Sequence, residues 1–92
     1  MSLVYHFSPR SMSSKQYDEC IARLEAAGAG SPKGRLHHTS YGSPEELRVF
    51  DVWDSEESFA EFGKTLVPIL QELGVDPGTP EVSPVHNVIA GS

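Results

Sequence analysis

The chain has 92 residues, of which 38% are hydrophobic and 22% are charged, and its formal net charge at pH 7 is −6. A chain of this length normally builds one hydrophobic core, so we expect residues 1–92 to form a single domain, and the composition excludes a disordered chain. The longest apolar run, Leu66–Leu70, is far shorter than the roughly 20 residues that cross a bilayer, so we expect no membrane association. The acidic balance also disfavours nucleic acid as a partner.

The start of the chain and its cysteine content bear on where the protein works. The sequence turns polar after Phe7, without a basic start or a long apolar stretch, so we recognise no secretory signal and expect a cytoplasmic location. The single cysteine, Cys20, forms no internal disulfide, and no cysteine pair is present to hold a structural zinc. We therefore expect packing to stabilise the fold.

The first part of the chain predicts a strand and then an amphipathic helix. Residues Leu3–Phe7 are rich in aromatic and β-branched side chains and are followed by a serine and a proline, which is typical of a strand. Ser13 and Gln16 have the spacing of a capping box at a helix start. Gly28 suits the end of this helix. Its apolar stripe repeats at steps of three and four residues: Tyr17, Cys20, Ile21, Leu24 and Ala27.

The second part of the chain predicts a hairpin, a second helix and a last strand. Residues Arg35–Tyr41 and Leu47–Trp53 resemble two strands joined by a Gly-Ser-Pro turn. A second helix is expected to begin after Asp54 or Ser55, and Val82–Ile89 to form an irregular or edge strand because of its prolines. The apolar face of the second helix recurs at helical spacing: Phe59, Phe62, Leu66, Ile69, Leu70 and Leu73.

The resulting order, β-α-β-β-α-β, predicts an α+β, ferredoxin-like sandwich in which two helices cover one face of a four-stranded antiparallel sheet, with strand order 4-1-3-2. Both faces of the sheet are apolar. Leu47 and Val49 alternate with Phe50 and Val52 along the third predicted strand. Two helices shield only one face, and soluble monomers rarely expose a large apolar patch, so we expect a homodimer that packs through the open sheet face.

The stretch Asp51–Phe59, read together with this order, resembles the dimeric α/β-barrel superfamily, and within it the antibiotic-biosynthesis-monooxygenase-like proteins. Members of that group commonly carry a tryptophan at the end of the third strand before a short acidic helix start. The resemblance implies a ligand cavity between the tryptophan-bearing sheet face and the helices, and some members are cofactor-free monooxygenases of polycyclic phenols. Haem-degrading members have a histidine where this chain has Phe62, so the resemblance does not imply haem.

The candidate site depends on how the predicted strands pair. If the hairpin is centred on Pro44, His37 lies beside Asp51, and if the first and last strands pair through their middles, His6 lies beside His86. These residues would then share one sheet face with Tyr41, Val49 and Trp53. A carboxylate beside a histidine can charge and orient it as a general base, whereas Asp51 in an apolar strand is also explained by a purely structural pairing.

We therefore predict a small-molecule binding protein for an apolar or phenolic aromatic ligand, and a cofactor-independent monooxygenase as its enzymatic form. His37 and Asp51 are the candidate catalytic residues, and Trp53, Tyr41, His6 and His86 the candidate ligand-binding residues. A non-catalytic ligand-binding protein and a dimeric interaction module are the alternatives, in which Trp53 belongs to the core and Tyr41 caps the hairpin. We expect no cofactor and no metal, because His37 and His38 point to opposite faces of a strand.

Overall fold

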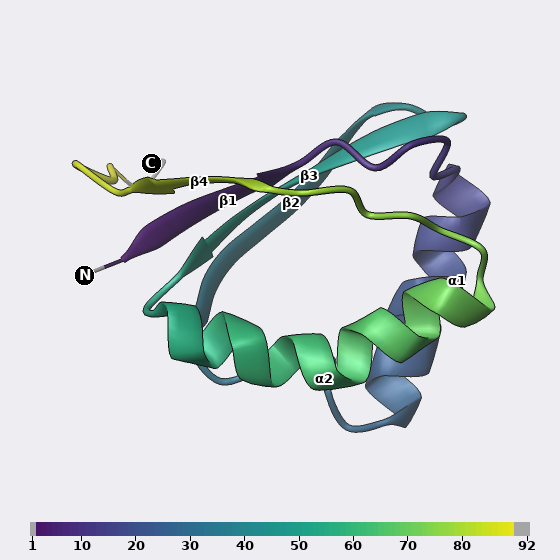
Figure 1. Ribbon diagram of the computed structural model, residues 1–92, viewed down its shortest axis with the longest axis horizontal. Helices are drawn as coiled ribbons and strands as arrows, with labels where there is room; N and C mark the ends of the chain where they lie inside the picture. Colours follow the sequence, from purple (N-terminus) through teal and green to yellow (C-terminus); the bar gives the residue numbers. More distant parts are fainter. Residues whose placement is uncertain (1, 90–92) are drawn as a thin grey trace.

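The computed structural model describes residues 2–89. Its elements follow the predicted order and form one four-stranded antiparallel sheet, with strand order β2-β3-β1-β4 and both helices on one face (Figure 1). The ferredoxin-like prediction is confirmed. The bounds are β1 (Leu3–Phe7), α1 (Ser14–Ala26), β2 (Arg35–Ser43), β3 (Glu46–Trp53), α2 (Glu56–Glu72) and β4 (Glu81–Pro84).

Both helices begin at side-chain caps that the sequence predicts. The Ser13 side chain accepts a hydrogen bond from the backbone N–H of Gln16, and the Gln16 side chain accepts one from the backbone N–H of Ser13, which completes the capping box of α1. Ser55 caps α2 by accepting from the backbone N–H of Ser58. The chain leaves α1 through Gly28, whose φ of +78° favours glycine. Local sequence signals therefore set where each helix begins.

The core lies between the sheet and the two helices. β1 and β3 point alternate side chains toward the helices, and Trp53 at the end of β3 is completely buried. Tyr5 stacks on Phe59 of α2, with ring centroids 4.2 Å apart. Large aromatic side chains therefore pack where the sheet meets α2. The candidate site lies in the same layer, between the sheet and the helices.

The hairpin of β2 and β3 contains a β-bulge that changes which side chains face the helices. From Ser43 back to His37, each β2 residue pairs with its β3 partner in one regular register, but Arg35 pairs with Trp53 after a shift of one residue. Leu36 is the extra residue, and its side chain is 61% exposed. Residues on the two sides of Leu36 therefore follow different alternations.

The last strand is shorter than expected and pairs elsewhere. We expected Val82–Ile89 to be a strand, but β4 covers only Glu81–Pro84, and its partner for His6 is Glu81. After Pro84 the chain makes one more backbone hydrogen bond, from Val85 N–H to Ser2 O at 3.0 Å, and then leaves the sheet edge. Pro80 and Pro84 have no backbone N–H to donate to a neighbouring strand, which explains why β4 is short.

The sheet face away from the helices is only partly apolar, which corrects the prediction of an apolar face: His6, Thr39 and Arg48 lie on it among the apolar side chains. Val4, Phe50 and Val52 share this open face, because paired residues of neighbouring strands lie on the same side. Phe50 is 36% exposed and Tyr41, which joins this face from β2, is 39% exposed. Within residues 2–89, no helix combines the length and hydropathy needed to span a membrane.

Candidate functional site

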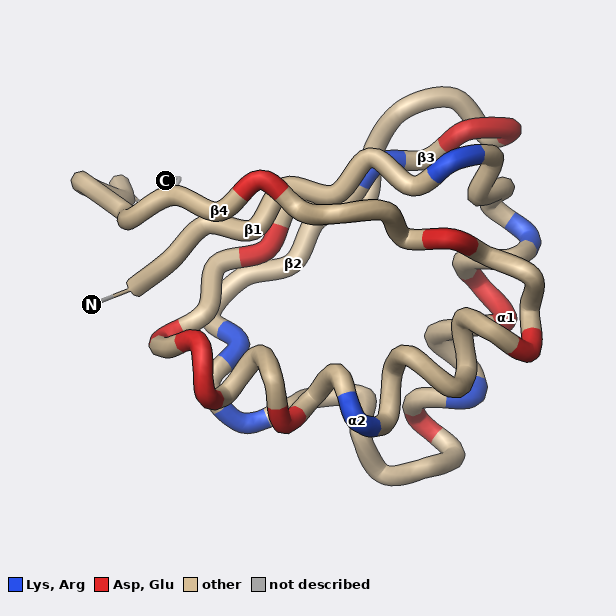
Figure 2. The backbone as a smooth tube through the Cα atoms, in the orientation of Figure 1, with Lys and Arg blue, Asp and Glu red and all other residues tan. Residues whose placement is uncertain are grey.

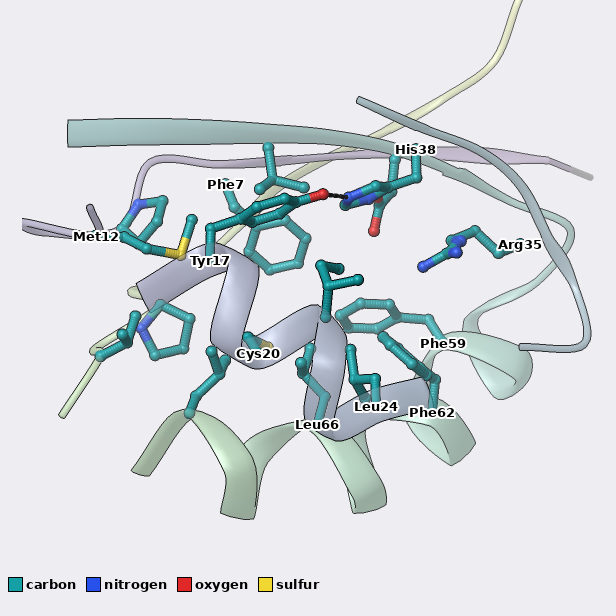
Figure 3. Close-up of a pocket in the computed structure, with 17 residues that line it drawn as sticks. Phe7, Met12, Tyr17, Cys20, Leu24, Arg35, His38, Phe59, Phe62 and Leu66 are labelled. Atoms are coloured by element: carbon teal, nitrogen blue, oxygen red, sulfur yellow. Dashed lines mark hydrogen bonds and ion pairs between the residues drawn. The ribbon is translucent and has the colours of Figure 1, made fainter. Parts of the chain in front are cut away.

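A cavity lies between the sheet and the helices and is the candidate ligand site. Its volume, counted as the space that the centres of water-sized molecules can reach, is about 80 Å³. Its walls are mostly apolar, with rings and aliphatic side chains from α1, α2, β1 and β3, and Figure 3 shows these side chains converging on the cavity. Such a space suits a small apolar ligand. The apolar walls include Phe7, Met12, Ile21, Leu24, Phe59, Phe62 and Leu66.

Three hydrogen-bonded polar side chains, Tyr17, His38 and Asp51, form a polar wall of this cavity, and Trp53 joins them from the core. The hydroxyl of Tyr17 on α1 lies 2.6 Å from His38 Nε2 (Figure 3). On the other side of the imidazole, His38 Nδ1 lies 2.5 Å from Asp51 Oδ1. Trp53 Nε1–H donates to the other carboxylate oxygen, Asp51 Oδ2, at 3.2 Å. Tyr17, His38 and Asp51 all line the cavity, whereas Trp53 lies behind them in the core. The buried carboxylate is therefore fully partnered.

The chemistry of these partners fixes the direction of each hydrogen bond. A carboxylate only accepts, so the proton between His38 and Asp51 is on His38 Nδ1, and the neutral imidazole keeps its lone pair on Nε2. The Tyr17 hydroxyl then donates to that lone pair. Asp51 is 4% exposed, so its negative charge faces His38 in a poorly hydrated place. His38 Nε2, which accepts from Tyr17, therefore lies at the cavity edge.

The structure corrects the predicted histidine partner of Asp51. His38, and not His37, pairs with Asp51, while His37 pairs with Val52 on the open face and contacts Thr39 at 2.6 Å. The hairpin has a two-residue turn at Pro44 and Glu45 and is not centred on Pro44. Every pairing between this turn and the bulge is therefore shifted by one residue from the predicted register. A one-residue shift exchanges the faces of neighbouring side chains, and this exchanges the two histidines.

The other predicted ligand-binding residues lie outside the cavity. His6 and Tyr41 are on the open face, with His6 Nε2 2.5 Å from the Tyr41 hydroxyl, and neither borders the cavity. His86 is exposed beyond the end of β4 and does not pair with His6. Trp53 has no exposed surface on which a ligand could stack, so its role is to fill the core and donate to Asp51. Of the six predicted site residues, Asp51 alone lines the cavity.

Sequence reasoning missed three polar residues of the cavity wall. The helical periodicity places Tyr17 on the apolar stripe of α1, and that stripe does face the cavity, but the pattern does not show the hydrogen bond of its hydroxyl. His38 was noticed only as a neighbour of His37. Arg35 entered as the start of a strand, and no local signal marked it as a cavity residue.

Cys20 lines the cavity floor without a reactive partner. Burial raises the pKa of its thiol, an effect that the nearby Arg23 guanidinium partly offsets. A raised pKa keeps the thiol neutral and weakly nucleophilic at neutral pH. Over residues 2–89, no group of three or more histidine, cysteine, aspartate or glutamate side chains is arranged to hold a metal ion.

Together these features define a ferredoxin-like protein with a mostly apolar cavity beneath its sheet, in which Tyr17, His38 and Asp51 form a polar wall. No protein-family model matches the chain, and no curated protein matches its sequence. Solved structures do match it, over nearly the full length of both chains. The cofactor-independent oxygenase SnoaB from Streptomyces nogalater superposes with a TM-score of 0.62 at 14% identity, covering 98% of this chain and 96% of its own.

Two further structures give the same result. A candidate antibiotic biosynthesis monooxygenase from Deinococcus radiodurans has a TM-score of 0.61 at 12% identity and covers 100% of this chain and 99% of its own. Another from Chloroflexus aurantiacus has a TM-score of 0.57 at 21% identity and covers 98% and 97%. The chain therefore has the fold of the antibiotic-biosynthesis-monooxygenase-like proteins of the dimeric α/β-barrel superfamily, which confirms the resemblance at the level of the fold.

Proposed function

We propose that the cavity binds a small, flat, phenolic aromatic molecule and that His38, oriented by Asp51, removes the proton of its hydroxyl group. The observation that carries this proposal is the hydrogen-bonded chain from Tyr17 through His38 to Asp51, placed in the wall of a cavity that is mostly apolar. An apolar cavity holds an aromatic ring, and a single polar wall orients its hydroxyl.

The hydrogen bonds supply each part of a general-base site. His38 Nε2 already accepts a phenolic O–H, that of Tyr17, so the hydroxyl of a bound phenol fits the same position after Tyr17 rotates aside. When His38 takes the proton, Asp51 stabilises the resulting imidazolium through the Nδ1–H bond. Trp53 keeps the carboxylate in place by donating to its second oxygen. The product of this step is a phenolate held against apolar walls.

A phenolate of this kind can reduce dioxygen without a cofactor, which extends the proposal to a monooxygenase. The substrate supplies the electrons: a ring methylene and O₂ give a ring carbonyl and one water, so one oxygen atom enters the product and the other leaves as water. SnoaB, which shares the fold, is a cofactor-independent oxygenase, and this supports the choice of reaction. The proposal includes membership of the antibiotic-biosynthesis-monooxygenase-like family and a cytoplasmic location.

The proposal also includes a homodimer, in which two chains pair through the open sheet face. Phe50 and Tyr41 expose aromatic surface there, and Val88 and Ile89, on the segment beyond β4, are 69% and 85% exposed. Soluble chains rarely leave so many apolar side chains in water, and a second copy of the same face covers them by two-fold symmetry.

The experiment uses dithranol, a hydroxylated anthrone that oxidises to an anthraquinone. We expect dithranol to raise the melting temperature of the protein, and an oxygen electrode to record protein-dependent uptake of one O₂ for each anthraquinone formed, above the spontaneous rate in buffer. In His38→Gln, turnover should fall by roughly 100-fold or more, because the base is lost. His37→Gln is the matched control, since the neighbouring imidazole faces away from the cavity and its loss should leave turnover unchanged.

The outcomes separate the proposal from its alternatives. Binding of dithranol and of unoxidisable naphthols, without oxygen uptake, leaves a ligand-binding protein and removes the catalytic step. Equal loss of turnover in His37→Gln and His38→Gln contradicts the assignment of the base. No stabilisation by any phenol removes the cavity as a phenol site and leaves the dimeric interaction module.

A further inference from the structure

The cavity contains a cationic side chain that the proposed proton transfer does not use. Arg35, the first residue of β2, lines the cavity, and Figure 3 shows its guanidinium pointing inward from the side opposite Tyr17. Its carbon Cζ lies 5.9 Å from the ring centroid of Phe62, and one of its nitrogens donates to Gly30 O at 3.1 Å. The group is thus held over an aromatic wall with the rest of its donor fork free to bind a ligand.

The bulge at Leu36 is what brings Arg35 to the cavity. Residues three apart on a regular strand point to opposite faces, so Arg35 would face away from the helices whenever His38 faces toward them. The extra residue, Leu36, shifts the alternation by one, so that Arg35 and His38 both line the cavity while Leu36 is exposed to solvent. Bulges often re-aim a side chain beside a functional site.

The backbone before Arg35 is also fixed by a close approach to α2. Gly34 has a φ of +93°, and a side chain there would collide with Ser58. Its carbonyl accepts a hydrogen bond from the backbone N–H of Asp54 at 2.8 Å, which joins the start of β2 to the loop before α2. Arg35 is therefore presented by anchored backbone.

No carboxylate of the described residues neutralises Arg35. The four ion pairs of residues 2–89 do not include it, and both oxygens of Asp51, the acidic residue of the cavity, are engaged by His38 and Trp53. The nearby acidic group Asp54 is hydrogen-bonded to Ser58 and Ser55, and its pKa is lowered mainly by the Ser58 hydrogen bond. In a chain of net charge −6, this is an unusual place for an unpaired cation, and Figure 2 shows how few Lys and Arg positions there are.

From this geometry we infer that the ligand is an anionic phenol: an aromatic ring system with a carboxylate at the end that meets Arg35 and a hydroxyl at the end that meets His38. The planar guanidinium binds a carboxylate through paired N–H···O bonds, which give both attraction and orientation. The two polar groups then fix which ring position faces His38. This inference rests on the proposed phenol site and specifies its substrate class.

The test compares two probes that differ by one charge. The first is a hydroxynaphthoate with its hydroxyl and carboxylate at opposite ends of the rings, and the second is the methyl ester of the same compound. Isothermal titration at neutral pH should show the carboxylate bound at least tenfold more tightly than the ester by the wild-type protein. In Arg35→Met this ratio should fall to about one while the affinity for the ester is kept, and Arg35→Lys should restore part of the preference.

Lys33→Met is the matched control. It removes the same charge at a position two residues before Arg35, and the Lys33 side chain does not line the cavity. It should keep the preference for the carboxylate. Equal affinities of both probes for the wild-type protein, or an unchanged ratio in Arg35→Met, overturn the inference while the phenol site stands. Failure of both probes to bind overturns the phenol site itself, so the two ideas fail in different ways.

Discussion

The two faces of the sheet are built from similar residues but have different fates. On the helix-covered face, β3 presents Val49, Asp51 and Trp53 to a closed layer in which Trp53 has no exposed surface. On the open face, the same strand presents Phe50, which keeps 36% of its surface in contact with solvent. The contrast shows that residue type alone does not determine which side chains face the cavity. The register of the strands determines it.

The polar residues of the two faces show the same difference. His38 on the covered face is tied to a buried carboxylate and to Tyr17, so it has a fixed orientation and a charged partner. His6 on the open face contacts the Tyr41 hydroxyl and has no carboxylate within ion-pair distance among the described residues. Within the described residues, only the covered face therefore pairs a histidine with a carboxylate.

Truncating one aromatic side chain on each face should give the largest difference. Trp53→Ala removes a fully buried indole and leaves Asp51 without its second donor, so we expect a loss of about 3–5 kcal/mol in the free energy of unfolding. Phe50→Ala on the open face should cost about 1–2 kcal/mol or less, since this ring is already partly hydrated. Urea unfolding at dilutions where the chain is monomeric measures both values. Equal losses would contradict the distinction between the faces.

Adding a charge to the open face should break the proposed dimer without harming the fold. In Phe50→Asp a carboxylate would be buried twice in a two-fold interface, and we expect the dissociation constant of the dimer to rise by roughly 100-fold or more. Val67→Asp on α2 is the control, because Val67 is an exposed apolar residue, at 46%, in the helix layer. Light scattering across a dilution series reports the change. A wild-type chain that remains monomeric at high concentration rules out the proposed dimer.

The sequence predicts the elements well because their signals are local. The capping residues Ser13 and Ser55 and the strand Leu3–Phe7 are set by neighbouring residues, and the structure confirms them. The site is different, since His37 and His38 are exchanged by one residue of register. That register depends on the two-residue turn, whereas the bulge at Leu36 decides only where Arg35 points. Both are settled by the packing of the whole hairpin and not by any local motif.

The stability of the covered face should fall at alkaline pH through Cys20. Burial raises the pKa of this thiol in the folded chain above its ordinary value of 9.0. The folded state therefore holds the proton more tightly than the unfolded state, so the contribution is complete below pH 9.0 and is lost as the pH rises through the folded pKa. Denaturant titrations of wild type and Cys20→Ala between neutral and alkaline pH should show the wild-type stability declining more steeply. Parallel curves would contradict a raised pKa.

Deleting Leu36 should have the smallest effect, and it tests how the two faces are joined. Without this residue, Arg35 precedes His37 directly and stands two positions before His38, so a regular alternation keeps both Arg35 and His38 on the covered face. The deletion removes an exposed leucine and one unpaired backbone unit, and we expect the free energy of unfolding to change by about 1 kcal/mol or less. The preference for the hydroxynaphthoate over its ester should also survive. If the deletion abolishes that preference, the alternation around Leu36 does not explain how Arg35 is aimed.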